Sequence, residues 1–569
     1  MSLSRDRMRF LWRHRLPAPV QRTTYSVSID ISESENAPDE TIPATSLLAP
    51  VDPILSGTQS ILYMDMVVIA GGGAIASMGY LGSTFIRYVT NVLMAHMVTP
   101  AVYGMFGEVY SLMYILGFIA KLGFDIVFIR LLPHYRMQGR LDLISGLTRF
   151  ILCFTIISGI SMAGLFYFFS SQISLWLYHD AAYTALLRET TLLIPLIALQ
   201  MVLIAGLQAF KQALWKMYVE RLAQPLLTLI ILIYCFMIGW QVEGLSIATI
   251  IGYICSIVLG QVILLRIMRQ RTVRIQARYN PRLWMGLTLP MFFSGLVYAL
   301  ADTINTLLLG IVALPAEVAG YLVAERAAIF VTMPMAALAV RYTPLIVEYY
   351  CAGSSQKLVH MYRAITHWSF TLSFPIFLWL FVFRQAILVV FGPAYQHYER
   401  VLIIMGSGFL VYAILGPASY IFAMLGSPRF IVASSCVSIL SNVVLSFVLI
   451  QHYGASGAAL ALVFSSLITY GLSFFWVYYR LKMQPFHHNL YKPLLSGVFA
   501  ALSGVLASNL IQTESRSLQL PTTILAMLLF VIVYGLALFL LRLSPQDHFV
   551  LSHFFTRIIT KKRVTHPII

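Results

Sequence analysis

Long apolar stretches alternate with short polar segments along most of the chain. Fourteen stretches come close to or exceed the roughly 20 apolar residues that cross the hydrocarbon of a bilayer. Since none reads as the short alternating strands of a transmembrane barrel, the pattern predicts an all-α polytopic membrane protein with about 14 transmembrane helices. The predicted spans are 67–98, 101–131, 145–170, 190–210, 222–240, 244–266, 284–312, 318–340, 367–391, 401–425, 429–451, 456–479, 493–510 and 521–541.

Composition and charge agree with a membrane protein. Of the 569 residues, 59% are hydrophobic and only 11% are charged, and the mean hydropathy is +0.81. The net charge of +16 is dispersed over many polar segments, so it indicates topology, and no nucleic-acid partner is expected. Cytoplasmic loops collect Lys and Arg, and both tails are basic. Both termini are therefore predicted to be cytoplasmic, which an even number of helices also requires.

Motifs for catalysis and cofactor binding are absent from the sequence. There is no phosphate-binding Gly-x-x-x-x-Gly-Lys-Ser/Thr loop, no Gly-x-Ser-x-Gly elbow and no His-Glu-x-x-His. We therefore expect no cofactor, no metal site and no enzymatic activity. Five cysteines lie in predicted spans or a cytoplasmic loop without paired spacing, which argues against a disulfide framework or a zinc site: Cys153, Cys235, Cys255, Cys351 and Cys436.

The chain repeats itself at a spacing of about 215 residues. The matching positions are Pro100 with Pro315, Gly104 with Gly320, Gly244 with Gly457, and the Arg-x-x-Pro runs 130–133 with 341–344. Six helices return the chain to its starting side, so the repeats are predicted to be parallel bundles with a substrate site between them. The predicted division is a disordered basic and polar cytoplasmic tail (1–64), an N-terminal six-helix bundle (65–270), a basic linker (271–283), a C-terminal six-helix bundle (284–480), an appended two-helix hairpin (481–543) and a basic tail (544–569).

Ionisable residues inside the spans are the candidate functional residues, because charge is costly there and by default marks a transport pathway. In one interpretation Arg87, Lys121 and Arg326 line a central cavity and hold an anionic headgroup. The carboxylates that would then balance charge or couple an ion are Asp302, Glu108, Glu325 and Asp125. In the alternative interpretation these residues form neutral pairs that lock the halves together: Arg87 with Asp302, which is 215 residues away, Lys121 with Asp125, and Glu325 with a neighbour.

Two segments carry a resemblance to a known family. The run Leu-Met-Ala-His-Met-Val-Thr-Pro-Ala-Val-Tyr-Gly at 93–104 continues as Met-Phe-Gly-Glu-Val-Tyr-Ser-Leu, and Lys-Leu-Gly-Phe-Asp-Ile-Val-Phe-Ile-Arg-Leu-Leu-Pro follows at 121–133. They resemble the polysaccharide transporter family, which includes flippases for O-antigen and other lipid-linked oligosaccharides, with lipid II flippases as relatives. This family belongs to the superfamily that also holds multidrug and toxin extrusion antiporters. The resemblance covers roughly residues 70–480, and the last two helices match fourteen-helix members.

The resemblance implies a fold and a function. It implies two six-helix bundles around an alternately opening cavity, lined by cations of the first, second and eighth helices, where Arg87, Lys121 and Arg326 lie. The implied function is an ion-coupled flippase that moves undecaprenyl-diphosphate-linked oligosaccharide to the outer leaflet of the bacterial inner membrane. Its product would enter lipopolysaccharide, such as O-antigen, or exopolysaccharide. The implied partners are this substrate, membrane lipids and the polysaccharide polymerase or export machinery.

Three other functions remain open on the sequence. A multidrug-type cation antiporter of the same superfamily would need an acidic or aromatic cavity, against which the three intramembrane cations argue. A membrane enzyme such as a polymerase would need catalytic motifs and a large outward domain, and neither is found. A non-transporting membrane component of a polysaccharide synthesis complex is compatible with the sequence.

Overall fold

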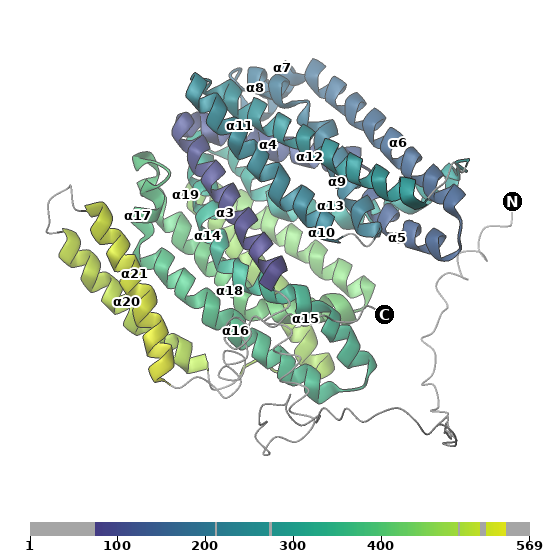
Figure 1. The fold of residues 1–569 in the computed structure, drawn as a ribbon. Helices are drawn as coiled ribbons and strands as arrows, with labels where there is room; N and C mark the ends of the chain where they lie inside the picture. Colours follow the sequence, from purple (N-terminus) through teal and green to yellow (C-terminus); the bar gives the residue numbers. More distant parts are fainter. Residues whose placement is uncertain (1–73, 211–212, 272–275, 487–489, 513–518, 542–569) are drawn as a thin grey trace, which may run out of the picture. The chain divides into compact units, whose positions relative to one another are not determined.

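The computed structural model describes residues 74–210, 213–271, 276–486, 490–512 and 519–541 (Figure 1). These ranges are helical and contain no strand, which confirms the all-α prediction for the described part of the chain. The predicted tails, 1–64 and 544–569, lie outside the described residues, as do linker residues 272–275. Within the described ranges, nine helices are long and apolar enough to cross a membrane and three shorter apolar helices accompany them. The number fourteen stays a prediction.

The first half of the repeat begins with α3 (Ala74–Met97), which lies within the predicted first span, 67–98. Thr99 caps the second helix, accepting a hydrogen bond on its side chain from the Val102 amide, and Pro100 occupies the first helical position. The elements of this half are α3 (Ala74–Met97), α4 (Pro100–Ala120), α5 (Phe124–Met137), α6 (Leu141–Phe168), α7 (Ser170–Ile173), η1 (Ser174–Tyr178), α8 (Tyr183–Thr190), α9 (Leu193–Ala209), α10 (Ala213–Met217), η2 (Tyr218–Ala223), α11 (Gln224–Ile238) and α12 (Val242–Arg271).

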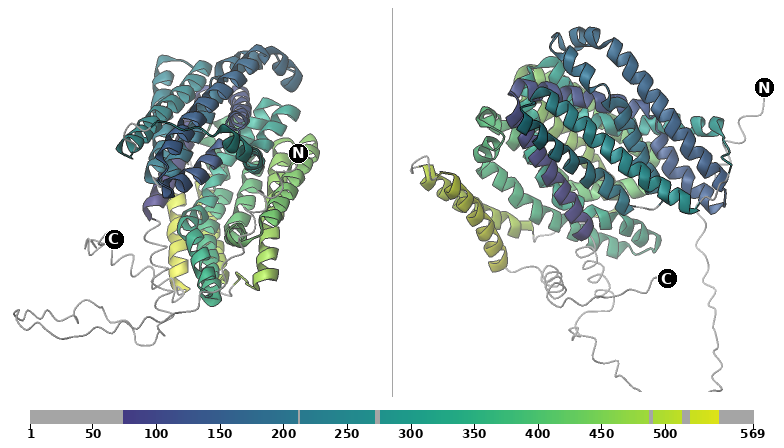
Figure 2. Two further views of the ribbon diagram at one scale, coloured as in Figure 1. Left: turned by 90° about the vertical axis from the view of Figure 1, so that its right-hand side faces the viewer. Right: turned by 45° about the horizontal axis from the view of Figure 1, so that its top comes forward.

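The second half follows the same order, and its helices lie beside those of the first half, green against blue and teal in Figure 2. Proline again opens the helix after the repeat motif, at Pro315. The elements are α13 (Pro281–Val312), α14 (Pro315–Ala328), η3 (Ile329–Thr332), α15 (Met333–Cys351), α16 (Ser355–Val382), α17 (Arg384–Val389), η4 (Pro393–Tyr398), α18 (Glu399–Leu425) and α19 (Pro428–Leu481). Two further helices, α20 (Tyr491–Gln512) and α21 (Gln519–Leu540), pack against each other and against α16.

Helix α19 covers two predicted spans, 429–451 and 456–479. Its backbone leaves helical geometry at Gly454, where φ is 55° and ψ is −131°. A positive φ is a conformation that glycine adopts at little cost. The helix therefore consists of two arms that meet at this kink, close to the predicted boundary.

The second predicted span, 101–131, is interrupted, which the sequence analysis did not foresee. Helix α4 ends at Ala120, and Leu122 and Gly123 take positive φ values of 48° and 76° before α5 begins at Phe124. A Cβ on Gly123 would approach the Phe292 amide nitrogen to 2.8 Å. The break therefore lets α13 pack closely against the start of α5.

The repeat motif forms the contact between the halves. A Cβ on Gly104 would overlap the carbonyl oxygen of Pro315, and a Cβ on Gly320 would overlap the ring of Tyr398. The Gly104 contact brings α4 and α14 together backbone against backbone near the first turn of each, whereas the Gly320 contact packs α14 against η4 of the same half. The two repeated glycines are needed at their positions because no side chain fits there.

Three clusters of buried apolar side chains make up the core of the described residues. One is shared by both halves, through α4 and α9 on one side and α14 and α18 on the other. Another belongs to α5, α6, α9 and α12, and the third to α15, α16, α18 and α19. The halves thus share a core at the helix ends near 97–103 and 391–402, and have separate cores at the opposite ends. A gap between the halves follows from this division.

The beginning of α13 packs with the first half, although the predicted boundary placed residue 284 in the second. Trp284 is fully buried in the core of α5, α6, α9 and α12, and its indole nitrogen donates to the Tyr135 hydroxyl at 3.1 Å. The apolar stretch from 284 to 312 predicts a helix, but it does not identify the helices against which it packs.

Candidate functional site

A cavity of about 1010 Å³ lies between the two halves. Its described walls come from α3, α4 and α11 of the first half and from α14, α18 and α19 of the second. The volume is at the upper end of what ligand pockets commonly offer. Its position between the repeats is where the sequence analysis expected a substrate site.

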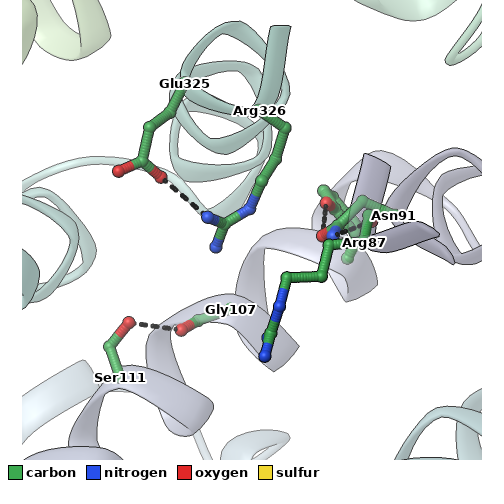
Figure 3. A network of polar contacts seen from close by, with 7 residues as sticks. Arg87, Asn91, Gly107, Ser111, Glu325 and Arg326 are labelled. Carbon is green, nitrogen blue, oxygen red and sulfur yellow. Dashed lines mark hydrogen bonds and ion pairs between the residues drawn. The ribbon is translucent and has the colours of Figure 1, made fainter. Parts of the chain in front are cut away.

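Charge in this cavity comes from three residues among those described. Arg87 on α3 and Arg326 on α14 line it together with Glu325, and every other described lining residue is uncharged. Figure 3 shows both guanidinium groups extending from their helices toward the part of α4 that carries Gly107 and Ser111. The formal sum of the three charges is +1, so the cavity suits an anion better than a cation.

Arg87 is held in place by the start of α11. Its guanidinium donates to the side-chain oxygen of Gln224 at 2.9 Å and to the Glu220 carbonyl at 3.4 Å. Glu220 lies in the π-helical turn η2, a type of distortion that often occurs at functional sites. The backbone carbonyl of Arg87 also accepts from the Asn91 side chain (Figure 3). The Tyr103 hydroxyl donates to the Asn91 side-chain oxygen at 2.9 Å. Gln224 and the Glu220 carbonyl orient the guanidinium of Arg87 through one of its nitrogens. Its other N–H groups remain for a ligand.

Arg326 keeps more of its donors available. The nearest carboxylate oxygen, on Glu325, lies 3.7 Å from a terminal nitrogen, which is beyond hydrogen-bonding distance. Its Nε is buried and has no hydrogen-bond partner among the described residues. The side chain is 36% exposed to the cavity. A buried charged donor without a partner is costly, and an anion in the cavity would remove that cost.

Lys121 and Asp125 lie away from the cavity and pair with each other. Lys121 is 2% exposed, its Nζ is 2.5 Å from the Asp125 carboxylate, and the Phe118 ring lies 3.8 Å from the same nitrogen. The sequence analysis placed both residues on one face of a continuous helix. They instead bridge the break between α4 and α5, which Leu122 and Gly123 create, so the pair fastens two helices together.

Glu108 is also outside the described cavity lining. It is fully buried, accepts a hydrogen bond from the Tyr183 hydroxyl at 2.6 Å, and packs where a side chain on Gly310 would otherwise be. The position of Asp302 falls within α13, but its side chain lies outside the described residues, so a pair with Arg87 stays a prediction. Of the seven residues selected from the sequence, the structure brings Arg87, Glu325 and Arg326 into one cavity.

Uncharged polar residues of the cavity were missed by the sequence analysis. Helix α19 contributes a row of hydroxyl side chains to the lining, and tyrosines line it from α4, α18 and α19. The signal was visible: residues 434, 435 and 438 and residues 465, 466, 469 and 473 are Ser or Thr at helical spacing. Hydroxyl groups are common in membrane helices, and the sequence does not say that these face a cavity.

Metal binding has no support in the described part of the chain. No group of three His, Cys, Asp or Glu side chains there could hold a metal ion. The five cysteines are free thiols.

Comparisons with known proteins agree with this geometry. Residues 69–350 match a family model described as polysaccharide biosynthesis protein, and residues 290–448 match the MatE family model. The lipid II flippase MurJ in an inward closed conformation aligns with a TM-score of 0.62 and 14% identity, over 86% of this chain and all of that one. The chain therefore has the fold of the multidrug/oligosaccharidyl-lipid/polysaccharide exporter (MOP) superfamily, and its sequence resembles two family models, neither of which covers half of the chain.

Other MOP structures share the fold. An inward-facing multidrug resistance MATE transporter aligns with a TM-score of 0.59 and 14% identity, over 71% of this chain and 98% of that one. A MOP transporter from Pyrococcus furiosus, whose description notes a binding pocket of reverse polarity, aligns with a TM-score of 0.52 and 14% identity, over 74% and 95% of the two chains. A comparison with curated proteins gives no match. The chain is thus a multi-span membrane protein with the fold of MOP flippases and transporters, and its relatives are transporters rather than enzymes.

Proposed function

We propose that this protein is a flippase for lipid-diphosphate-linked oligosaccharide, with undecaprenol as the lipid and the bacterial inner membrane as the site of action. The observation that carries the proposal is the arginine pair, Arg87 and Arg326, in the cavity between the halves. The match to a polysaccharide biosynthesis family over residues 69–350 and the structural likeness to a lipid II flippase support it. The product would serve cell-surface or extracellular polysaccharide synthesis.

The arginine pair supplies what a diphosphate needs. A diphosphate does not cross hydrocarbon unaided, because a charge at the centre of a bilayer costs several kcal/mol or more. The planar fork of an arginine donates two parallel hydrogen bonds to phosphate oxygens. Arg326 has donors without partners among the described residues, and Arg87 is oriented by Gln224. When the anion leaves, Glu325 at 3.7 Å remains as a counter-charge for Arg326.

Alternating access provides the movement. The halves share one core at the ends near 97–103 and 391–402 and have separate cores at the other ends, which carry the loops that we predict to be cytoplasmic. The cavity would then open toward the cytoplasm in this structure. Rocking of the halves would close that side and separate α4 from α14, which opens the outer side while the headgroup stays bound.

A multidrug-type cation antiporter of the same superfamily is the second candidate. MATE transporters share the fold, but two arginines and one carboxylate among the described lining residues give the cavity the wrong sign for an organic cation. A non-transporting component of a polysaccharide synthesis complex would not need an anion site between the halves at all.

Transport in everted membrane vesicles tests the proposal. With a fluorescent undecaprenyl-diphosphate-linked sugar as substrate, Arg87→Ala and Arg326→Ala should each lower the initial rate about 10- to 100-fold, the effect of losing one hydrogen bond to a charged group. Arg149→Ala is the matched control, because Arg149 is an exposed arginine of α6 that does not line the cavity. Equal rates in all three variants would refute the proposal. Collapsing the proton or the sodium gradient in the same vesicles tests ion coupling.

A further inference from the structure

The cavity wall formed by α18 and α19 differs chemically from the wall with the arginines. Its described lining residues carry no charge. Serine and threonine hydroxyls occupy it along both arms of α19, with Ser419 on α18 beside them. We call this surface the hydroxyl wall.

Most hydroxyl groups of this wall have already used their donors. Six of its eight described Ser and Thr residues donate their single proton to a backbone carbonyl of their own helix three or four residues earlier, and Ser438 is bonded to the Thr469 hydroxyl, which leaves Ser466 with a donor for a ligand. The bonds to carbonyls run from Ser434 and Ser435 to Ile431 (both 2.9 Å), from Ser465 to Leu462 (3.0 Å), from Thr469 to Ser465 (2.8 Å), from Ser473 to Thr469 (2.9 Å) and from Ser419 to Gly416 (2.7 Å). A hydroxyl has one donor and two acceptor lone pairs, so what the serine and threonine hydroxyls offer a ligand is mainly acceptors. The donors on this wall are few, among them the Ser466 hydroxyl and the Asn442 amide.

The two sides of the cavity therefore differ in the hydrogen-bonding groups that they offer. Arginine has five N–H donors and no acceptor, so Arg87 and Arg326 present donors from α3 and α14, whereas the hydroxyl wall presents mainly acceptors from α18 and α19. A matching ligand has acceptors at one end and donors at the other. A diphosphate joined to a sugar has this pattern, because phosphate oxygens only accept and sugar hydroxyls can donate.

Tyrosine rings complete the wall. Tyr412 and Tyr470 line it with ring centroids 5.4 Å apart, and the hydroxyls of Tyr412 and Tyr420 are 2.9 Å apart. Flat, amphipathic rings provide apolar contact next to polar tips. The C–H faces of a pyranose fit such rings while its hydroxyls reach the serines.

We infer that the hydroxyl wall binds the sugar next to the diphosphate, and that this sugar is uncharged and rich in hydroxyl groups. The inference rests on the proposed function, which places the diphosphate at the arginines. A sugar acid would bring a carboxylate, which only accepts hydrogen bonds, against a wall that offers mainly acceptors. Most of the serines would have to give up their bonds within the helix before they could donate to that carboxylate.

Binding to the purified protein in lipid nanodiscs tests this inference. The probes are three farnesyl diphosphate diesters that differ in the second substituent: methyl, glucose and glucuronic acid. Glucose should improve affinity about 10-fold over methyl, the effect of two neutral hydrogen bonds. Glucuronic acid should bind about 10-fold more weakly than glucose, despite its additional attraction to the arginines.

The variants separate the two ends of the cavity. Ser434→Ala, Ser435→Ala and Ser465→Ala combined should abolish the advantage of glucose and leave the affinity for the methyl diester unchanged. Ser407→Ala is the matched control, because Ser407 donates to a carbonyl of α18 but does not line the cavity. Unchanged affinity for the methyl diester also shows that the triple variant is folded.

The outcomes distinguish this inference from the proposed function. If Arg326→Ala weakens the methyl diester but glucose adds nothing in the wild-type protein, the inference is wrong and the proposed function stands. If glucuronic acid binds as tightly as glucose, the selection for an uncharged sugar is wrong. If Arg326→Ala changes the affinity for none of the probes, the proposed function itself fails.

Discussion

At the scale of single residues, equal charges inside the membrane have different tasks. Arg326 has an unpartnered buried donor beside a cavity, whereas Lys121 is enclosed by Asp125 and the Phe118 ring. A buried charge is tolerated when it is paired, and breaking such a pair costs about 3–5 kcal/mol. Lys121 therefore stabilises the break between α4 and α5, while Arg326 is suited to binding.

Substitution at the Lys121–Asp125 pair tests this distinction. Asp125→Asn should lower the free energy of unfolding by about 3 kcal/mol, because it leaves the lysine charge buried without its partner. Lys121→Met combined with Asp125→Leu should restore most of the loss and keep transport. Thermal unfolding in detergent and vesicle transport measure the two effects. A stable double variant without transport would instead show that Lys121 contacts the substrate.

At the scale of elements, the crossing of α4 and α14 depends on a single missing side chain. The Pro315 carbonyl oxygen occupies the space that a Cβ on Gly104 would need. The clash would be with backbone atoms, which cannot move aside as the end of a flexible side chain can. The repeat motif thus encodes the place where the two halves meet.

Gly104→Ala should consequently be severe for so small a change. We expect a loss of about 1–3 kcal/mol in the free energy of unfolding, as for other overpacked sites, with a matching loss of transport. Gly164→Ala on α6 is the control, since a Cβ there meets no atom within 4 Å and alanine favours a helix. Thermal unfolding of both variants checks this, and equal stability would contradict the backbone contact.

At the scale of the whole molecule, one shared core and two separate cores mean that the halves are closed against each other at one end of the cavity and apart at the other. Opening the other side of the cavity requires the α4–α14 region to separate. A Cβ on Gly107 would lie 3.5 Å from the Leu322 Cγ, so this pair spans the junction.

A disulfide across that junction should stop transport. Gly107→Cys with Leu322→Cys, in a background where the five native cysteines are alanine, should lose transport under oxidising conditions and regain it with a reductant. Each single cysteine variant should be insensitive to the redox conditions. Full transport by the cross-linked protein would rule out separation of the halves at this point.

The helical membrane architecture, the approximate span positions and the internal repeat could be predicted from the amino-acid sequence alone. These depend on the local length of apolar runs, which the thickness of the bilayer dictates, and on spacings such as that between Gly104 and Gly320. The break at Leu122 and Gly123 was not predicted, because it goes with the close approach of Phe292, which is distant in sequence.

Which polar side chains share the cavity depends on how the helices pack and could not be predicted from the sequence. Arg87 and Arg326 are far apart in sequence, and the face that each helix turns inward is set by packing against its neighbours. The same holds for Lys121, which looked equivalent to them along the chain. It also holds for Ser434 and Ser465, whose arms of α19 come together because the helix folds back at Gly454. A hydropathy pattern records the depth of a residue in the membrane, whereas the direction of its side chain depends on contacts between distant segments.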